Sequence, residues 1–486
     1  MNLSGDPWVP VVGADGKYEL VSLKALFNKA SSIADLCIDP HQRVALMRFL
    51  IALVQRALNG PVDDTGWKNC RSAIPSAATA YLDMHHEKFE LYGPSAFLQA
   101  PGLKATGNAS LDKLDFGLAS GNNHTLFDHG ASPEGRMQSP AWQALMLITY
   151  QNFSPGGLIG TTEWNGKGTN SKSEHAPAIE GSPLHIFLQA DNILDTIHMN
   201  LVPFARLKTS EGVPIWEKMP TGPDDCSENN ATYLGRMIPM PRAIKLEDSK
   251  SRFTLANGLK YPKLPEYIDP LLIVMPNKKN TYSYLRINPD KHPWRELHNI
   301  LTVAEGGGRA AMLDNLKNLG PEQTVRIWTG GLAADKAKLE NTGEWMLNVP
   351  VKIAFGDNIQ KTYAQGVELA DQSEGLLKES IKKYMAEIVK DSARDSQSGM
   401  TGKGVSEVVA YFWHNLDQKH ETLLEESEKQ DLGKWRELLI DTARNAFISV
   451  CSCETPRRIE AFVSGKGYLE ATLNKIINKK KEVDAK

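Results

Sequence analysis

The most suggestive residues for chemistry form a run of glycines ending in a lysine, which could cradle the phosphates of a nucleotide. In such a phosphate-binding loop four residues separate the two glycines, and Ser or Thr follows the lysine. Here five residues separate Gly160 from Gly166, and Gly168 follows Lys167. The spacing and the missing hydroxyl therefore argue against nucleotide binding and favour a mobile loop.

Two groups of histidines could in principle bind zinc. A zinc hydrolase helix places two histidines four residues apart, so that both lie on one face. Neither His85-His86-Glu87 nor the pair His292 and His298 has that spacing. The chain also lacks the Gly-x-Ser-x-Gly turn that presents a serine nucleophile. The sequence therefore predicts ordinary surface or packed histidines, and no enzyme activity.

Three polar, glycine-bearing loops remain as candidate binding elements. They span residues 118–130, 154–157 and 329–338. Adjacent glycines remove side-chain bulk, so a backbone can approach a groove or a phosphate closely. Taken alone, each loop is equally typical of a structural turn.

The composition limits which partners and compartments are possible. The chain has 486 residues and a net charge of −3, so bulk charge does not favour nucleic acid and any contact needs a local patch. Five cysteines without paired spacing predict neither a disulfide scaffold nor a zinc site. No signal peptide and no run of 18 apolar residues is found, so we expect a soluble, cytoplasmic protein without membrane contact, metal or cofactor.

Several elements that must position these loops have clear local signals. Segments 8–12 and 18–21 resemble strands on either side of a turn at 13–16 that is rich in Gly and Asp, and together they predict a hairpin. Ser22 is then expected to cap a short helix. Helical periodicity runs from 41 to 58, and Ser139-Pro140 marks another helix start. The glycine-rich segment 154–173 is predicted to be a functional or disordered loop.

The other candidate loop follows a strand. Residues 325–328 read as a strand that ends at the double glycine 330–331, before a small basic turn.

The last part of the chain changes to a helical pattern. Helices are predicted for segments with apolar residues at helical spacing, namely 362–391, 404–427, 432–452 and 456–481. Short polar connections favour antiparallel neighbours. We therefore expect a division into domains 1–360 and 361–486, the second a helical bundle.

These features in series resemble one family. The opening Met1-Asn-Leu with Asp6-Pro-Trp-Val-Pro10 resembles the start of CasA, the large subunit of the type I-E CRISPR surveillance complex Cascade. The resemblance spans nearly the whole chain and is carried by motifs in the same order: 122–129 (NNHTLFDH), 154–157 (SPGG), 253–259 (FTLANGL) and the double glycine 330–331.

The resemblance implies both a fold and a function. The implied fold is α+β, with a mixed α/β N-terminal domain of unusual fold followed by a C-terminal four-helix bundle. The implied subunit is not catalytic: it recognises the PAM, the short motif beside the target in double-stranded DNA, and promotes duplex opening and R-loop formation by the guide RNA. It also helps recruit the helicase–nuclease in antiviral defence, and its partners are the other Cascade subunits, CRISPR guide RNA and target DNA.

Carried over residue by residue, the resemblance implies contacts to the PAM. The family's glycine loop against the minor groove matches Gly156 and Gly157. Its basic finger matches Arg252, with Lys250 as a near alternative, and an arginine suits the negative potential of a narrow groove.

The resemblance also implies a wedge and an aromatic loop. The wedge that props the duplex open matches Lys336, followed by Ala337. Lysine in place of the glutamine of other members changes the hydrogen bonding to bases, so the PAM preference stays open. The loop near the PAM and the guide end matches Asn123 to Asp128, with Phe127 or Leu126 as the apolar contact.

Two other readings of these residues remain. Arg252 and Lys336 are equally typical of solvated surface charges. A soluble hydrolase with a helical accessory domain is the alternative function, and its sign would be a pocket with convergent carboxylates or histidines. The CRISPR subunit that the resemblance implies has no metal, since the regions that carry cysteine pairs in some members have none here.

Overall fold

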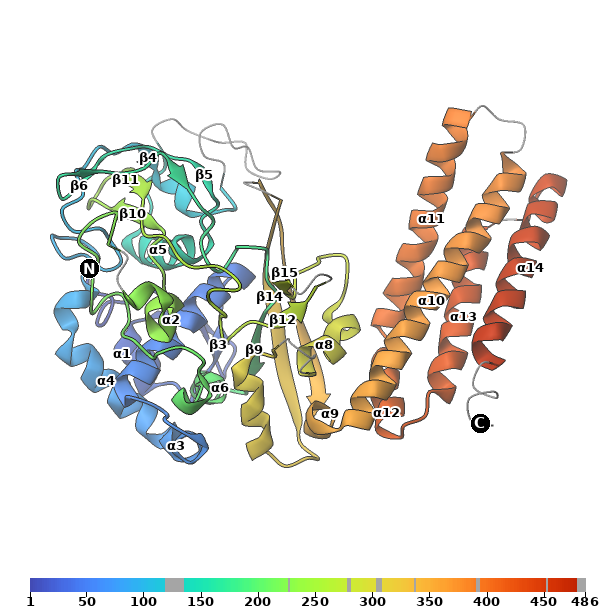
Figure 1. The fold of residues 1–486 in the computed structure, drawn as a ribbon, viewed down its shortest axis with the longest axis horizontal. Helices are drawn as coiled ribbons and strands as arrows, with labels where there is room; N and C mark the ends of the chain where they lie inside the picture. The colour runs from blue at the N-terminus through green and yellow to red at the C-terminus, as the bar shows by residue number, and fades with distance from the viewer. Residues whose placement is uncertain are drawn as a thin grey trace. The chain divides into compact units, whose positions relative to one another are not determined.

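The computed structural model describes residues 1–118, 135–225, 228–277, 281–302, 308–335, 338–389, 394–451 and 453–478. It is mixed in helix and sheet, as the sequence predicts (Figure 1). The described chain forms two compact units, one of residues 1–293 with 302–351 and the other of 294–301 with 352–486. Each is described by itself below.

The first unit combines helices with several small sheets. Its helices are α1 (Leu23–Asn28), α2 (Pro40–Leu58), α3 (Asp64–Cys70), α4 (Ile74–Met84), α5 (Pro140–Phe153), α6 (Ile193–Asn200) and α7 (Tyr233–Met237). Its strands are β1 (Val9–Gly13), β2 (Tyr18–Val21), β3 (Ile33–Leu36), β4 (Ala109–Ser110), β5 (Gly157–Leu158), β6 (Glu163–Trp164), β7 (Lys167–Gly168), β8 (Lys172–Ser173), β9 (His185–Gln189), β10 (Arg242–Lys245), β11 (Arg252–Asn257), β12 (Val274–Pro276), β13 (Tyr282–Tyr284), β14 (Thr324–Asp335) and β15 (Lys338–Pro350).

Helix α2 forms the centre of the first unit. Proline occupies its first turn, and Gln42 Oε1 accepts a hydrogen bond from the Asp39 amide at 3.2 Å, which fixes the start of the helix. Residues 41–55 are buried without interruption, so the helix packs on all sides rather than on one stripe. It contacts α4, α5 and β14.

The local signals at the N-terminus are confirmed. Strands β1 and β2 pair antiparallel, with Val9 opposite Val21, and β3 pairs on the other edge of β1. Ser22 caps α1 by accepting a hydrogen bond from the Ala25 amide at 3.2 Å. The predicted start of α5 is also confirmed, because Ser139 caps this helix: its Oγ accepts a hydrogen bond from the Trp142 amide at 3.2 Å.

The strand predicted for 325–328 does not end at the double glycine, so that expectation is wrong. Strand β14 continues through Gly330 and Gly331 to Asp335 and pairs with β15 along its length, while β9 pairs with its other edge. A Cβ at Gly330 would lie 2.6 Å from the Trp328 ring and 2.8 Å from the Gly343 carbonyl oxygen. The glycines make room for the strand instead of ending it.

The segment 154–173 is folded, which corrects the expectation of a disordered or mobile loop. Strand β5 pairs with β8, and β6 pairs with β7 around an Asn165-Gly166 turn at positive φ. The Trp164 side chain anchors this hairpin: it is fully buried and donates from Nε1 to the Pro101 carbonyl oxygen at 2.9 Å. One aromatic side chain therefore gives a polar, glycine-rich segment a core.

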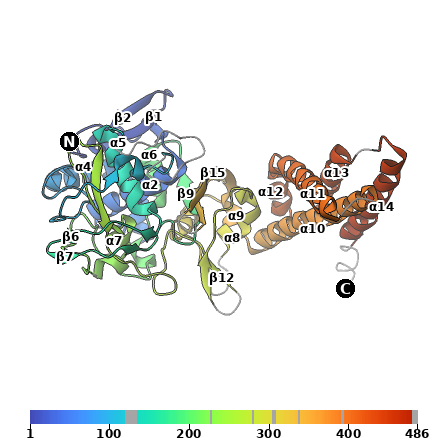
Figure 2. The same ribbon diagram turned by 90° about the horizontal axis from the view of Figure 1, so that it is seen from above.

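The second unit consists of helices. These are α8 (Leu297–Leu301), α10 (Asp357–Ile388), α11 (Arg394–Asp417), α12 (Glu421–Glu428), α13 (Gly433–Val450) and α14 (Pro456–Asn478), with most of α9 (Val351–Phe355). The long helices α10, α11, α13 and α14 pack along one another (Figures 1 and 2). The predicted helix 404–427 is instead broken between α11 and α12, where the Lys419 amide donates to the Leu416 carbonyl oxygen.

The division between the units lies before the expected position. The first unit ends at residue 351, while the sequence suggested a boundary between 360 and 361, a point that falls inside α10. Segment 294–301 also joins the second unit, where Trp294 Nε1 donates to Asp417 Oδ1 at 2.7 Å. No helix of the described ranges is long and apolar enough to cross a membrane.

Candidate functional site

The glycine turn predicted from sequence directly follows α5. Gly156 is packed tightly, because a Cβ there would lie 3.0 Å from three backbone atoms of residues 173–175. Gly157 is exposed, has φ +141° and has nothing within 4 Å of the position of a Cβ. The first glycine is thus required for packing, while the second presents bare backbone to solvent.

A buried arginine holds this turn in place. Arg242, at the start of β10, is 1% exposed. Its guanidinium donates to the carbonyl oxygens of Pro155 at 2.7 Å, of Glu174 at 2.8 Å and of Pro241 at 2.8 Å. One side chain therefore joins both strands of the turn to the sheet formed by β10, β11 and β4.

His175, two residues after β8, also fixes the turn. The Gly156 amide donates to its Nδ1 at 3.2 Å, which requires a neutral ring with the proton on Nε2. Burial, together with the charges of Lys263 and Arg242, lowers the pKa of His175 below its ordinary value, against the opposing charge of Glu180. The neutral form that the turn needs is therefore favoured at neutral pH.

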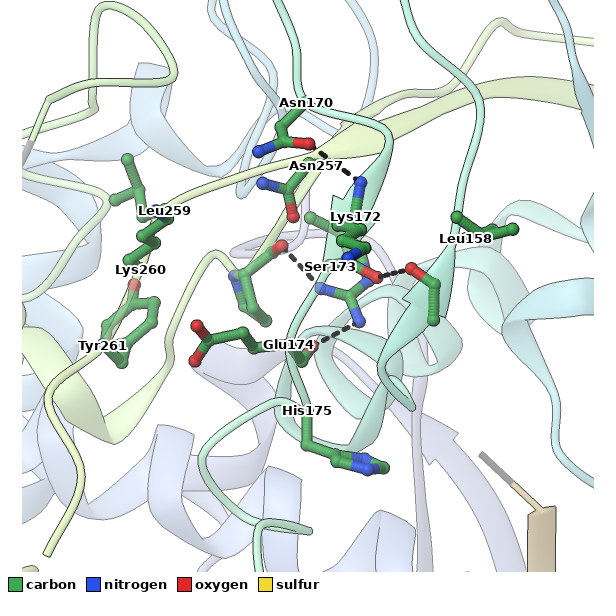
Figure 3. A pocket seen from close by; sticks show the side chains of 13 residues that line it. Leu158, Asn170, Lys172, Ser173, Glu174, His175, Asn257, Leu259, Lys260 and Tyr261 are labelled. Carbon is green, nitrogen blue, oxygen red and sulfur yellow. Dashed lines mark hydrogen bonds between the residues drawn. The ribbon is translucent and has the colours of Figure 1, made fainter. Parts of the chain in front are cut away.

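A pocket of about 520 Å³ opens beside the turn. Leu158 and Lys172 form one side, and Leu259, Lys260 and Tyr261 lie across from them (Figure 3).

The charge of this pocket is positive. Three cations, Lys172, Lys260 and Arg242, line it against one carboxylate, that of Glu174. Glu174 already pairs with Lys263 at 3.2 Å. Both lysines of the lining are exposed, and neither makes an ion pair within the described part of the chain. The pocket therefore offers free positive charge beside exposed backbone, an arrangement suited to a phosphate backbone.

The predicted basic finger lies elsewhere on the same sheet. Arg252 begins β11, five residues from Asn257 of the pocket, which is about 17 Å along a strand. Its Nε donates to the Gly107 carbonyl oxygen at 2.7 Å. Lys250 is exposed in the preceding turn. The structure does not bring either residue into the pocket beside Gly157.

Arg252 and the segment that follows Gly157 nevertheless contact the same two residues, Gly107 and Asn108. The neighbour of Gly107, Asn108, bonds β11 through both ends of its amide: it donates to the Leu255 carbonyl oxygen at 2.9 Å and accepts from the Leu255 amide at 2.8 Å. A Cβ at Gly160 would overlap that Asn108 amide. Residues 107–108 thus connect the segment that follows Gly157 with Arg252.

The remaining predicted contacts lie outside the described residues. Lys336 and Ala337 fall between the paired ends of β14 and β15 at Asp335 and Lys338. Asn123, Phe127 and Asp128, with the alternative Leu126, also fall outside the described ranges.

Sequence reasoning missed the residues that hold the turn and charge the pocket. Arg242 stands inside an apolar run from Met237 to Ile244, and a charge in such a run is a usable signal of a buried, fully bonded side chain. The Asn165-Gly166 pair is a strong hairpin signal that predicts the folded segment. Lys172 and Lys260 carry no comparable signal, since they are far apart in sequence.

The pocket presents backbone and cations, with few other titratable groups. Within the described ranges, no three side chains of His, Cys, Asp or Glu gather to hold a metal ion. The only titratable groups lining the pocket apart from its cations are Glu174, His175 and Tyr261. Exposed backbone between cations matches how proteins follow a groove and its phosphates.

Three comparisons give the relatives of this chain. A family model described as CRISPR-associated protein Cse1 matches residues 2–447. A CRISPR-associated protein CasA/Cse1 from Thermus thermophilus is 26% identical over 470 residues, covering 92% of this chain and 91% of that protein.

Solved structures share the fold. The structure of Thermus thermophilus CasA (Cse1) matches with a TM-score of 0.81 at 21% identity, over 98% of this chain and 99% of that one. A chain of a CRISPR RNA-guided surveillance complex matches with a TM-score of 0.75 at 18% identity, over 97% of this chain and 99% of that one.

Proposed function

Because the chain belongs to the CRISPR-associated protein Cse1 family, we propose that it is the large subunit of a type I-E Cascade surveillance complex. In this role it recognises the PAM in double-stranded DNA, promotes duplex opening by the guide RNA and helps recruit the helicase–nuclease. Its partners are the other Cascade subunits, the guide RNA and target DNA. It carries out no reaction itself, and base pairing with the guide reads the remaining sequence.

The observation that carries the proposal is the exposed backbone at Gly157 beside free cations. A minor groove is only about 6 Å wide, so a turn without side chains can enter where a larger residue cannot. Arg242 holds that turn through the Pro155 carbonyl oxygen at 2.7 Å, so the groove meets a surface that is already ordered. Lys172 and Lys260 then face the phosphates on either side.

The proposed basic finger is Arg252, with Lys250 as the alternative. The 2.7 Å hydrogen bond to Gly107 restrains the Arg252 side chain, and Lys250 stands exposed two residues earlier. Arg252 begins β11, which pairs with the strand β10 that carries Arg242, and Lys250 lies in the connection between these two strands. A second contact on the sheet that anchors the glycine turn gives the duplex a defined orientation.

The proposed wedge is Lys336 with Ala337. Strands β14 and β15 pair through Asp335 and Lys338, so these two residues connect the ends of a long hairpin. A hairpin paired over this length is a stiff support for a residue that must separate bases. We assign the loop from Asn123 to Asp128, with Phe127 or Leu126, to the PAM and guide end, and the long helices α10, α11, α13 and α14 of the second unit to the C-terminal four-helix bundle.

The direct test of this function is duplex opening by the assembled complex. Complexes carrying the wild-type chain or Lys336→Ala are mixed with a PAM-bearing target that contains 2-aminopurine beside the PAM, and its fluorescence reports unstacking. We expect the variant to assemble normally and to open the target at least about tenfold more slowly. Lys17→Ala, on the β1–β2 turn, is the matched control.

Two results would contradict the proposal. One is opening by Lys336→Ala at the wild-type rate, which would remove the wedge assignment. The other is turnover of a substrate by the purified chain alone, which would favour the alternative of a soluble hydrolase.

A further inference from the structure

A second pocket in the first unit carries no role in the function proposed above. It has a volume of about 510 Å³, which is in the range of small-molecule sites. It is lined by residues of α7, β13 and β14, by Arg286 two positions after β13, and by residues of segments 175–182 and 261–264. It shares His175 and Tyr261 with the first pocket, so the two adjoin.

The central feature of this second pocket is a buried arginine with unsatisfied donors. Arg236 of α7 is 5% exposed, and its guanidinium lies over the ring of Tyr267 at 4.1 Å and of Tyr261 at 5.6 Å. Its Nε and one terminal nitrogen are buried and find no acceptor among the described residues. These two nitrogens are closed to solvent, so a ligand in the pocket would meet Arg236 through the positive charge of its guanidinium.

Among the described residues, no carboxylate forms a hydrogen bond or ion pair with Arg236. The buried carboxylate nearby is Asp269, and its two oxygens already accept hydrogen bonds from Arg48 at 2.9 Å and from the Leu271 amide at 2.9 Å. Two buried arginines therefore share one buried carboxylate. The surplus positive charge lines the pocket, where an anion would neutralise it.

Other residues that line the second pocket add two cations, Arg286 and Lys263, and one carboxylate, Glu180. Arg286 is exposed and makes no ion pair within the described ranges. Lys263 pairs with Glu180 at 3.2 Å. The other oxygen of Glu180, Oε2, is buried and has no hydrogen-bond partner among the described residues. The lining thus holds three cations and one carboxylate, and the Glu180 side chain is 35% exposed, so a ligand can reach it.

These contacts define a ligand with an anionic group and a neighbouring hydroxyl. We propose that the pocket binds a phosphorylated sugar, with its phosphate against Arg236 and Arg286 and a sugar hydroxyl donating to Glu180. A phosphate supplies several acceptor oxygens for a planar guanidinium, and carboxylates commonly accept from ribose hydroxyls. The ligand is either a free sugar phosphate or one unit of an RNA strand, and it does not depend on PAM recognition.

The test uses the intact chain and ribose 5-phosphate as the probe, with inorganic phosphate and ribose as references. Affinity is measured by titration calorimetry at constant ionic strength. We expect ribose 5-phosphate to bind more tightly than either reference. Arg236→Gln and Arg286→Gln should each weaken binding by at least about tenfold, the loss expected for a charge-assisted hydrogen bond. Glu180→Gln should remove the preference over inorganic phosphate.

Two variants keep the test decisive. Arg286→Gln changes an exposed residue, so it reports on the site even where Arg236→Gln fails to fold. Lys208→Gln, an exposed lysine outside the pocket, should bind as the wild type does. Binding that is unchanged in folded Arg286→Gln, or no binding of ribose 5-phosphate at millimolar concentration, overturns the proposal.

A competitor identifies the source of the ligand. A five-nucleotide RNA with a free 5′-hydroxyl carries only phosphodiesters. If it displaces ribose 5-phosphate from the wild type and does so more weakly in Arg286→Gln, the site takes a unit of an RNA strand. If it does not compete, the site takes a free sugar phosphate. Either result supports the site itself.

Discussion

The guanidinium of Arg242 donates a 2.7 Å hydrogen bond to the carbonyl oxygen of Pro155, the residue before the paired glycines. A residue 87 positions away in the sequence thereby fixes the backbone that the proposed function brings to DNA. The same guanidinium donates to the carbonyl oxygen of Glu174, the residue directly after β8. The glycine turn is therefore a rigid element of the fold.

Replacing Arg242 tests this support. In Arg242→Gln the carbonyl oxygens of Pro155, Glu174 and Pro241 lose their donor, so we expect the first unit to lose about 3 kcal/mol of stability. Urea unfolding followed by tryptophan fluorescence measures the loss. The control is Arg326→Gln, whose guanidinium pairs at 2.6 Å with the 95%-exposed side chain of Asp191 and should cost at most about 1 kcal/mol. Equal losses in the two variants would contradict the role of Arg242.

The two glycines of the turn should respond differently to alanine. Gly156→Ala places a Cβ 3.0 Å from three backbone atoms, so we expect a lower urea midpoint and a displaced turn. Gly157→Ala meets no atom within 4 Å but is strained at φ +141°, by about 1 kcal/mol. We expect Gly157→Ala to have a larger effect on the affinity of the assembled complex for PAM-bearing DNA, because the new methyl group would stand where the minor groove approaches the turn.

The control for this series is Gly168→Ala, in the same segment. It is exposed, meets no atom within 4 Å and lies outside the positive-φ region, so stability and DNA binding should stay at the wild-type level. The interpretation of the turn fails if Gly157→Ala leaves the affinity of the complex for PAM-bearing DNA unchanged.

Lys172 and Lys260 should contribute to affinity through phosphates. Each contact to a phosphate releases about one counterion, so Lys172→Ala should reduce the slope of log K against log salt by about 1, uniformly across PAM sequences. The same is expected for Lys260→Ala, and for whichever of Arg252 and Lys250 is the finger. Filter binding by the complex at several salt concentrations gives the slope. An unchanged slope in both Lys172→Ala and Lys260→Ala would show that these pocket lysines do not contact the DNA phosphates.

Two buried histidines should make the first unit sensitive to acid. Burial lowers the pKa of His41 and of His185 from the ordinary value of 6.5 to about 4. Between these values the unfolded chain binds protons that the folded chain does not, so stability falls as the pH drops from 6.5 toward 4. The loss is on the order of 3 kcal/mol for each histidine once the pH is below 4.

Urea midpoints measured from pH 7 to pH 4.5 test this dependence. Neither ring nitrogen of His41 has a hydrogen-bond partner among the described residues, so His41→Leu should flatten the pH dependence without losing a bond. The control is His414→Leu, at an exposed position, which should leave the pH dependence of the urea midpoint unchanged. A His41→Leu profile parallel to the wild type would show that this histidine does not titrate as a buried group.

Local signals explain which elements the sequence predicts. The caps at Ser22 and Ser139 and the hairpin ending at Val21 depend on neighbours in the chain, and all three are confirmed. The double glycine resembles the end of a strand in the sequence because its partner is distant. A Cβ at Gly330 would meet the Trp328 ring and the Gly343 carbonyl oxygen, and one at Gly331 would lie 3.2 Å from the Pro183 carbonyl oxygen, so only the folded structure shows why β14 needs glycines there.

Buried arginines mark the limit of sequence reasoning at the site. The apolar run around Arg242 signals that this side chain is buried but not what it bonds, and Arg236 resembles a surface charge in the sequence although it is 5% exposed. Their roles depend on which carbonyl groups and rings the fold brings to them. The glycine turn itself is predictable from sequence, since adjacent glycines are a local feature, whereas the charges around it come from segments about 90 residues apart.

The most direct test of the proposed function is the affinity of the reconstituted, guide-RNA-loaded complex for duplexes that differ only in the flanking trinucleotide. The account predicts that affinity changes at least about tenfold with those bases, and that Gly157→Ala removes most of the difference. Equal affinity for every trinucleotide, in a complex that contains this chain and binds its target, would contradict it.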